Sequence, residues 1–484
     1  MRVTHPIPRV LFFTDNGMGL GHLTRVLAIA RRSKGRFQPI VLTLSLAYWL
    51  LDDWDVPAEH FPSYGHLGVT KRQWTAPLTD RLVEAVRWTG AGAIVVDHVS
   101  PPSFERLRQA LPEIEVIWLR RGLWKPGKNR DALATGPSFT TIVEPGDLAA
   151  PVDQGPTTYD RTEVIRVPPL TLVSPDEYLA REEARSVLGL PTEGRAILLQ
   201  LGEIDTASLK ERIIEAREAV LRVVHPENVH FFAPLHPLHP ELDDIPGVIC
   251  RPVYPIGRYF RAFDAAISNA GYNSYHELVS SGLPVVFIAR ETRIDDQTRR
   301  ALFAQWAGRA YVAPSTTGTE FEAALSQALR PHEPAIAQAT TDQLIPMTGA
   351  DEVAALLSRL ASPGTPTSTI PRYSRETEDV PVSRHELPSL LRDLEGSRLV
   401  IDARQADYST VAKAIPAIRD HPTVIPLIRG GHPSLTDLAV PYESVMSARQ
   451  WEQLGSPVPY EQYTHARLAS MVARYSAEMV LTLA

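Results

Sequence analysis

Short apolar runs alternate with amphipathic stretches along the first part of the chain. Residues 10–14 form a compact apolar run, and the apolar positions that follow, over 23–30, recur at helical spacing. Further runs typical of buried strands lie at 40–44, 93–96 and 115–119. Strands that alternate with helices in this way predict parallel sheets covered by helices on both faces. We therefore expect an α/β fold.

The same alternation recurs in a second stretch. It opens with Ser-Pro-Asp-Glu at 174–177, which fits a helix N-terminus with a capping box. A helix over 350–360 closes it. Between them lie four predicted strands, at 196–201, 229–233, 264–268 and 284–289. This pattern predicts two α/β domains in succession, the first over 1–170 and the second over 171–361.

The last part of the chain is set apart by its composition. Residues 362–381 are dense in Pro, Ser and Thr and lack periodicity, which predicts a linker. Beyond it we expect a small α/β unit over 382–484, whose function no motif indicates. Its predicted elements are strands at 398–401 and 423–428, a helix at 411–418 and a long final helix at 461–481.

Composition excludes several classes of protein. The chain has 484 residues, with 49 Lys and Arg against 56 Asp and Glu, a net charge of −7 that argues against a nucleic-acid binder. The single cysteine, Cys250, permits neither an intrachain disulfide nor a cysteine-rich metal cluster. No apolar run approaches the roughly 20 residues of a spanning helix. We expect a cytoplasmic protein that contacts a membrane only peripherally, if at all.

A glycine-rich loop between the first predicted strand and helix is the first candidate site. The segment NGMGLGHLTR contains Gly17, Gly19 and Gly21, which allow close approach of the backbone to a ligand. The N–H groups of the following helix would point at an anionic or polyhydroxylated ligand. The segment is not the dinucleotide-binding fingerprint, because no third glycine follows at the required spacing. A tight turn without a ligand is the alternative.

Two side chains near this loop are candidate catalytic groups. Histidine titrates near neutral pH, so His22 at the helix start could take a proton from a sugar hydroxyl. Asp97 ends a predicted strand, at the sheet edge where α/β folds bind ligands, and could be an alternative base or could orient His22. Their structural alternatives are a packing or capping histidine and a turn-forming or capping aspartate.

The second candidate site lies between 264 and 301. A loop turns at Gly271, and a short helix then carries Asn273, Ser274 and Glu277. The Glu277 carboxylate could accept hydrogen bonds from the two vicinal hydroxyls of a ribose, although Ser274 and Glu277 also fit a capping box. After the next strand, Gln297 could bind sugar hydroxyls, whereas the preceding Asp295 or Asp296 could cap a helix.

Together these segments resemble a GT-B nucleotide-sugar glycosyltransferase. The resemblance is to the branch that contains the peptidoglycan N-acetylglucosaminyltransferase and proteins with a GLGHLTR-type loop, and it covers residues 9–361. It implies two facing Rossmann-like domains, the first binding an acceptor and the second a UDP-sugar, with no cofactor and no obligatory metal. It places Gly19, Gly21 and His22 near the reacting centre. The donor-binding residues expected on this basis are Gly271, Asn273, Ser274, Glu277, Asp296 and Gln297.

One segment departs from that family. Where such transferases often have a Gly- and Ser-rich phosphate loop, this chain has QLGEIDTAS at 200–208, with Gly202 as its single glycine. Glu203 or Asp205, if turned inward, would repel a diphosphate by roughly 3 kcal/mol at about 5 Å and an effective dielectric near 20. The identity of the donor therefore stays open.

Three functions are compatible with these motifs. The first is transfer of a sugar to an acceptor hydroxyl on a small molecule, a glycan or a lipid-linked molecule. The second is hydrolysis of a UDP-sugar, as in the pseudaminic acid pathway, with His22 activating water. The third is a non-catalytic nucleotide-sugar-binding subunit.

Two further segments carry weaker signals. The basic segment at 120–130 could contact an anionic acceptor or a membrane surface, but a solvated loop is favoured. His236 and His239 lie among prolines without a third ligand, which favours a surface turn over a metal site.

Overall fold

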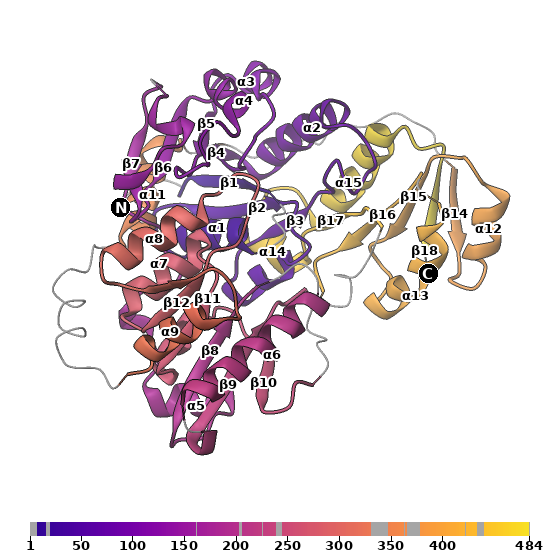
Figure 1. Ribbon diagram of the computed structural model, residues 1–484. Coiled ribbons are helices and arrows are strands. Elements are labelled where there is room, and N and C mark those ends of the chain that lie inside the picture. Colours follow the sequence, from indigo (N-terminus) through magenta and orange to yellow (C-terminus); the bar gives the residue numbers. More distant parts are fainter. Residues whose placement is uncertain are drawn as a thin grey trace, which may run out of the picture.

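The chain folds into three successive parallel sheets that are covered by helices (Figure 1). This confirms the predicted α/β fold with two Rossmann-like units and an additional small α/β unit. The computed structural model describes residues 7–15, 20–160, 162–202, 206–224, 226–238, 244–330, 347–362, 364, 378–421, 423–432 and 440–483.

The first sheet has seven strands in the order β3-β2-β1-β4-β5-β6-β7. Its strands are β1 (Arg9–Thr14), β2 (Gln38–Thr43), β3 (Ala58–His60), β4 (Ala91–Asp97), β5 (Glu115–Leu119), β6 (Thr141–Pro145) and β7 (Ile165–Val167). The helices of this domain are α1 (Gly21–Arg31), α2 (Lys71–Thr89), α3 (Glu105–Ala110) and α4 (Arg130–Leu133). Short 3-10 turns lie at η1 (Tyr48–Trp54), η2 (Gly136–Ser138), η3 (Ala150–Val152) and η4 (Pro156–Thr158).

Local sequence accounts for the longest of these helices. Thr70 and Gln73 form a capping box before α2, and Gly90 ends it with a left-handed φ of 66°. Every residue of β4 is buried, as expected of a central parallel strand covered on both faces.

The second sheet has six strands in the order β10-β9-β8-β11-β12-β13. Its strands are β8 (Arg195–Gln200), β9 (Val229–Leu235), β10 (Val248–Pro252), β11 (Ala265–Ser268), β12 (Val285–Ile288) and β13 (Tyr311–Ala313). Its helices are α5 (Arg181–Leu188), α6 (Thr206–Val223), α7 (Tyr272–Ser281), α8 (Gln297–Trp306) and α9 (Thr319–Ala328), with 3-10 turns η5 (Pro175–Glu177), η6 (Pro226–Asn228) and η7 (Ile256–Ala262). The predicted capping box of Ser174 and Glu177 is present, but it caps the short 3-10 turn η5 and not an α-helix.

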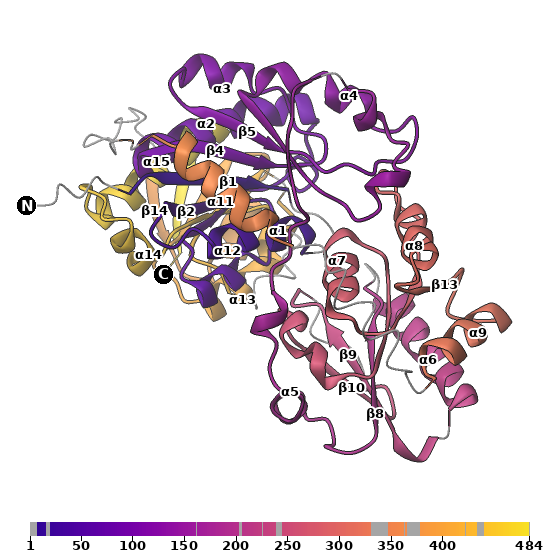
Figure 2. The ribbon, with the colours of Figure 1, turned by 90° about the vertical axis from the view of Figure 1, so that its left-hand side faces the viewer.

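A helix at the end of the second domain crosses back to the first. In Figure 2, α11 (Gly349–Leu360) lies over the first domain, and it contacts α1 and β7. A side chain at Gly349 would clash, because its Cβ would lie 1.9 Å from the Pro168 carbonyl oxygen. The chain therefore joins the two domains twice, although the predicted boundary at 361 assigned this helix to the second domain.

The third sheet has five strands in the order β14-β18-β15-β16-β17. Its strands are β14 (Glu378–Val382), β15 (Leu399–Ala403), β16 (Val424–Arg429), β17 (Glu443–Val445) and β18 (Met479–Leu483), and its helices are α12 (Leu387–Asp393), α13 (Tyr408–Arg419), α14 (Ala448–Gln453) and α15 (Tyr460–Tyr475).

Two predictions for this region need correction. The final helix was predicted to reach 481, but α15 ends at Tyr475 because Ser476 adopts a left-handed φ of 50°. The residues after it form β18, which lies between β14 and β15. The predicted linker ends earlier than expected because β14 begins at Glu378, and residues 363 and 365–377 lie outside the described residues.

The third sheet packs against the edge of the first. Strand β17 contacts β3, and the His60 N–H donates to Ser444 Oγ at 2.7 Å. Beside these strands, three acidic and three basic side chains form a buried ion-pair cluster between the two units. Its members are Glu59, Arg81 and Glu84 of the first domain and Glu443, Arg467 and Arg474 of the third unit.

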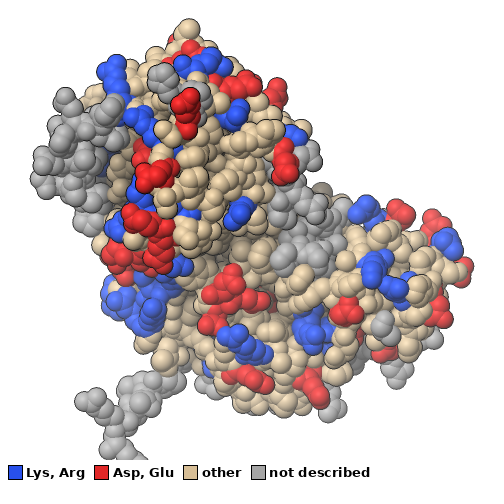
Figure 3. Space-filling model, turned by 90° about the horizontal axis from the view of Figure 1, so that it is seen from below, with Lys and Arg blue, Asp and Glu red and all other residues tan. Residues whose placement is uncertain are grey.

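Two further observations bear on possible partners. On the face shown in Figure 3, acidic and basic side chains are intermixed and do not gather by sign. Among the helices that the structure describes, none has the length and apolar character needed to cross a membrane.

Candidate functional site

A cavity of about 520 Å³ lies between the first and second domains. It is reached by the carboxyl ends of strands in both sheets, which is where α/β folds place ligands. The first domain lines it with Leu20, Gly21, His22, Thr24, Arg25 and Arg121. The polar lining of the second domain includes Gln200, Asn269, Asn273, Ser274, Glu277, Arg290, Thr292, Asp295 and Gln297.

Three side chains of the first domain form a buried polar group at one wall of this cavity. His22 Nδ1 lies 3.1 Å from Asp97 Oδ1. Arg25 grips both carboxylate oxygens of Asp97, with Nε donating at 3.1 Å and Nη2 at 2.9 Å. Asp97 is 1% exposed, and although burial alone would raise its pKa, Arg25 and His22 hold that pKa well below its usual range. Asp97 is therefore a permanent anion that orients His22 and a poor proton acceptor.

The proton on His22 can occupy either ring nitrogen. Nδ1 can donate to Asp97, or it can accept from Arg25 Nη2, which lies 2.8 Å away. Only the first tautomer leaves the Nε2 lone pair free to act as a base. The charge of Asp97 favours that tautomer.

Two helix N-termini meet at the cavity. Helix α1 begins at Gly21, as the glycine loop predicts. Helix α7 begins at Tyr272, and its N-cap residue is Gly271, which has no side chain to accept a capping hydrogen bond. Asn273 Nδ2 donates to the Gly21 carbonyl at 3.0 Å, which joins the two helix starts. Free N–H groups at both helix starts favour an anion between them. Gly17 and Gly19 lie outside the described residues.

Glu277 lies on α7 at the cavity wall and is 6% exposed. Its Oε1 accepts the Leu172 N–H at 3.2 Å, and burial raises its pKa to about 7. The alternative capping box of Ser274 and Glu277 is wrong, because Gly271 is the N-cap of α7. Gln200 Nε2 donates to Ser274 Oγ at 3.3 Å.

The three residues before and at the start of α8 have separate roles. Asp296 caps the helix by accepting the Arg299 N–H at 3.0 Å, and it does not line the cavity. Asp295 lines the cavity and is held by Arg300 through two hydrogen bonds, of 2.8 and 3.0 Å. Gln297 also lines the cavity, and its Oε1 accepts the Arg290 N–H at 3.2 Å. Of the two residues expected to bind a donor here, the geometry retains Gln297.

Two buried acceptor atoms in the cavity wall lack a hydrogen-bond partner within the described residues. They are Gln200 Oε1 and Asn273 Oδ1, one from β8 and the other from α7. A buried carbonyl without a donor costs about 1–3 kcal/mol, so a ligand that supplies hydroxyl or N–H groups would relieve this cost. The sequence pointed to Asn273 but not to Gln200, which carries no motif.

The basic segment at 120–130 is a solvated loop only in its second half, where Pro126, Gly127, Lys128 and Arg130 are exposed. Arg120 is buried against Glu144 at 2.9 Å and also pairs with Asp160. Leu123 and Trp124 are buried, and this part of the chain pairs with residues 294–296 of the second domain. The acidic partners of Arg120 and Arg121 lie elsewhere in the chain. The local sequence therefore showed only a run of basic residues.

The two histidines among prolines do not form a metal site in the described part of the chain. His236 lines the cavity, and its Nδ1 accepts the Leu238 N–H at 3.1 Å. His239 lies outside the described residues. The residues that the structure describes contain no group of three or more His, Cys, Asp or Glu side chains placed to hold a metal.

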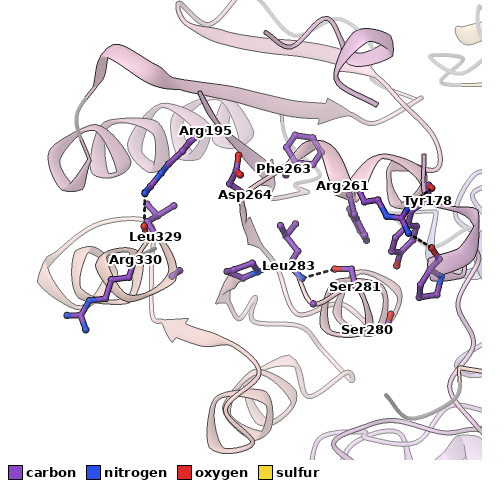
Figure 4. Close-up of a pocket in the computed structure, with 15 residues that line it drawn as sticks. Tyr178, Arg195, Arg261, Phe263, Asp264, Ser280, Ser281, Leu283, Leu329 and Arg330 are labelled. Atoms are coloured by element: carbon purple, nitrogen blue, oxygen red, sulfur yellow. Dashed lines mark hydrogen bonds between the residues drawn. The ribbon is translucent and has the colours of Figure 1, made fainter. Parts of the chain in front are cut away.

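A second cavity, of about 530 Å³, lies at the opposite, amino ends of the second sheet (Figure 4). Three of its four charged side chains make structural contacts, and the fourth, Arg330, is exposed. Arg195 donates to the Leu329 carbonyl at the end of α9 at 2.6 Å, and Arg261 donates to the Tyr178 carbonyl at 3.2 Å. Asp264 accepts from Arg181 at 2.9 Å. These contacts fix helix ends and loops, so the interdomain cavity is the candidate site.

Comparison with known proteins gives the fold. Comparisons with protein-family models and with curated proteins gave no match. Among solved structures, the glycotransferase of kitacinnamycin is similar at 14% identity and a TM-score of 0.52, covering 74% of this chain and 100% of that one. The spinosyn forosaminyltransferase SpnP is also similar at 14% identity and a TM-score of 0.52, covering 73% of this chain and 99% of that one. The first two domains therefore have the GT-B glycosyltransferase fold.

Proposed function

We propose that this protein transfers a sugar from a nucleoside diphosphate donor to an acceptor hydroxyl, and UDP-sugars are the first donors to test. The observation that carries the proposal is the His22–Asp97 pair, which lies across one cavity from the polar side chains of the second domain. The fold supports it, because the cavity lies between the two domains of a GT-B architecture.

The reaction needs one proton acceptor and one stabilised leaving group. His22 Nε2 takes the proton from the acceptor hydroxyl, while Asp97 holds the opposite ring nitrogen. The acceptor oxygen forms a bond to the anomeric carbon, and the bond from that carbon to the diphosphate oxygen breaks. The N-terminus of α7, capped by Gly271, stabilises the negative charge on the departing diphosphate.

The donor is held by the second domain. Glu277 accepts hydrogen bonds from the ribose hydroxyls, and Gln297 binds the sugar. Asn273 and Ser274, with the unpaired Gln200 Oε1, supply further hydrogen-bonding groups at the same wall. The acceptor is a small molecule, a glycan or a lipid-linked molecule that enters beside His22.

The proposal is tested by following labelled UDP-sugars with and without a panel of acceptors. We expect transfer to an acceptor, loss of turnover in His22→Ala, and retained UDP binding in that variant. The matched control is His465→Ala, which removes an exposed histidine far from the cavity lining and should leave turnover unchanged.

Other outcomes would count against the proposal. Rapid release of free sugar without any acceptor would assign hydrolysis, with water in place of the acceptor. Tight binding of a nucleotide sugar without turnover on any acceptor would assign a binding subunit.

A further inference from the structure

The diphosphate of the proposed donor needs positive charge that the second domain supplies only sparsely. The segment at 200–208 has one glycine, Gly202, in place of a Gly- and Ser-rich loop, and it contains Glu203 and Asp205. Preorganised donors at a developing negative charge are usually the largest contribution to this kind of catalysis. Among the described residues of the second domain, Arg290 is the single Arg or Lys side chain that lines the cavity, so a cation of the first domain would add to a sparse supply of positive charge.

Arg121 of the first domain is in the right place. It follows β5 and lines the interdomain cavity, and its side chain is 15% exposed. Its guanidinium lies 5.5 Å from the ring centroid of Tyr272, the first residue of α7. Arg121 thus reaches the helix whose N-terminus is proposed to bind the diphosphate.

The charge of Arg121 is only weakly neutralised. Its Nη1 lies 3.4 Å from Asp295 Oδ1, which is long for a charged hydrogen bond. The same oxygen accepts from Arg300 Nη2 at 2.8 Å, and Arg300 also bonds Asp295 Oδ2 at 3.0 Å. Arg300 also donates from Nε to Asp147 Oδ2 at 2.9 Å, so it bridges two carboxylates. Arg121 makes only the longer contact with Asp295 and keeps N–H groups for an incoming anion.

The other carboxylates around the cavity form no direct ion pair with Arg121 among the described contacts. Asp97 is gripped by both ends of the Arg25 guanidinium. Glu277 accepts the Leu172 N–H and has no ion pair with Arg121 among the described contacts. Burial and the nearby cations Arg25 and Arg300 lower the pKa of Arg121, against the opposing effect of the Asp295 and Asp97 carboxylates.

Backbone hydrogen bonds hold the segment that follows Arg121. Two residues further along, the Leu123 carbonyl accepts the Asp296 N–H at 3.0 Å, and the Lys125 N–H donates to the Ile294 carbonyl at 2.7 Å. This short pairing attaches the segment after Arg121 to the second domain. The guanidinium is therefore held at a fixed depth between the two domains, as preorganised electrostatic stabilisation requires.

We propose that Arg121 binds the donor's diphosphate from the acceptor-side domain and stabilises it as the leaving group. When the bond between the anomeric carbon and the diphosphate oxygen breaks, both electrons stay on that oxygen. Arg121 remains protonated and donates hydrogen bonds to the phosphate oxygens. This inference rests on the proposed function, because it names a residue that holds the same donor.

The test compares UDP with uridine, which lacks the phosphates. We expect Arg121→Gln to weaken UDP binding, measured by calorimetry, by roughly ten- to hundredfold, as for loss of a charged hydrogen bond. Uridine binding should stay unchanged. Arg121→Lys, which keeps the charge, should recover part of the UDP affinity. The matched control is Arg293→Gln, an exposed arginine near the same segment that does not line the cavity.

The outcomes separate the two proposals. If wild-type protein binds UDP and Arg121→Gln binds it equally well, the role of Arg121 is wrong while the proposed function stands. Equal loss of UDP and uridine binding in Arg121→Gln would also overturn it, because the effect would not depend on the phosphates. If wild-type protein binds neither UDP nor dTDP, the proposed function and this inference both fail. Thermal unfolding of each variant checks that the fold is retained.

Discussion

Asp97 shows how a neighbouring charge decides the role of a candidate base. The sequence left open whether Asp97 or His22 takes the proton. In the structure Arg25 holds both carboxylate oxygens, and the pKa of Asp97 is well below its usual range despite its burial. A group with so low a pKa is a weak base at neutral pH, so the proton acceptor in our proposal is His22.

The pKa of Glu277 predicts a pH dependence of donor binding. Burial raises this pKa to about 7, and only the carboxylate accepts from both ribose hydroxyls. UDP affinity should therefore rise by up to roughly tenfold between pH 6 and pH 8. In Glu277→Gln, binding should be weaker and nearly independent of pH in this range, as measured by calorimetry. Glu320→Gln, an exposed position, is the control.

The free energy of unfolding depends on pH in the opposite direction to donor binding. Because the folded chain holds this proton more tightly than the unfolded chain, the contribution of Glu277 to stability is greatest below about pH 4.5 and falls as the pH rises towards 7.

A pH dependence of UDP affinity in Glu277→Gln equal to that of the wild type would contradict the assignment of Glu277 to the ribose.

At the residue scale, the sequence identified candidate site residues where they belong to recognisable motifs. His22, Glu277 and Gln297 follow strands at sheet edges, and all three line one cavity. Arg25 and Arg121 lie in segments that the sequence indicated, but neither received a role of its own, because their partners are more than 70 positions away in the chain. No local pattern signals such a pairing.

Helix α7 is one of the elements that connect the two domains by buried hydrogen bonds. The Tyr272 hydroxyl accepts the Leu170 N–H at 3.1 Å and donates to the Gly146 carbonyl at 2.8 Å. Tyr272→Phe leaves both backbone groups buried and unpaired, so it should lower the free energy of unfolding by about 1–3 kcal/mol in urea titrations.

The control for this element is an exposed tyrosine. Tyr159 is 77% exposed, and Tyr159→Phe should change stability by less than about 0.5 kcal/mol. If both variants unfold at the same urea concentration as the wild type, α7 does not tie the domains together as described.

Element boundaries were predicted well where apolar runs were long and isolated. β5 matches its predicted range of 115–119, and α11 begins one residue before the predicted 350. The error at α15 has a physical cause, because the residues after Ser476 are as apolar as the helix before them. Helix α15 ends at the left-handed turn of Ser476, and β18 is a strand because it pairs with β14 and β15.

At the scale of the whole molecule, the third unit is built into the first domain. Arg467 is fully buried, pairs with Glu443 at 2.8 Å and lies 3.6 Å from Glu59 of the first domain. Removing residues 362–484 would leave Glu59, Arg81 and Glu84 without these partners. Such a truncation would thus test folding as much as catalysis.

A single substitution tests this attachment more cleanly. Arg467→Met leaves the buried cluster with three carboxylates and two arginines, so it should lower the free energy of unfolding by about 3–5 kcal/mol in urea titrations. Arg398→Met is the control, because Arg398 is 53% exposed and its pair with Glu478 spans 3.5 Å, which is worth about 1 kcal/mol at most. Equal destabilisation by the two variants would contradict the importance of the buried ion-pair cluster.

The central claim is that the interdomain cavity binds a nucleoside diphosphate sugar. Its most direct test is a thermal-shift titration of the full chain with UDP-, dTDP- and GDP-sugars, because a ligand that binds only the folded state raises the melting temperature. At a donor concentration about 100 times its Kd, the stabilisation is about 2.7 kcal/mol. We predict that at least one of these donors raises the melting temperature and that Glu277→Ala reduces the shift. No shift with any donor across the panel would contradict the account.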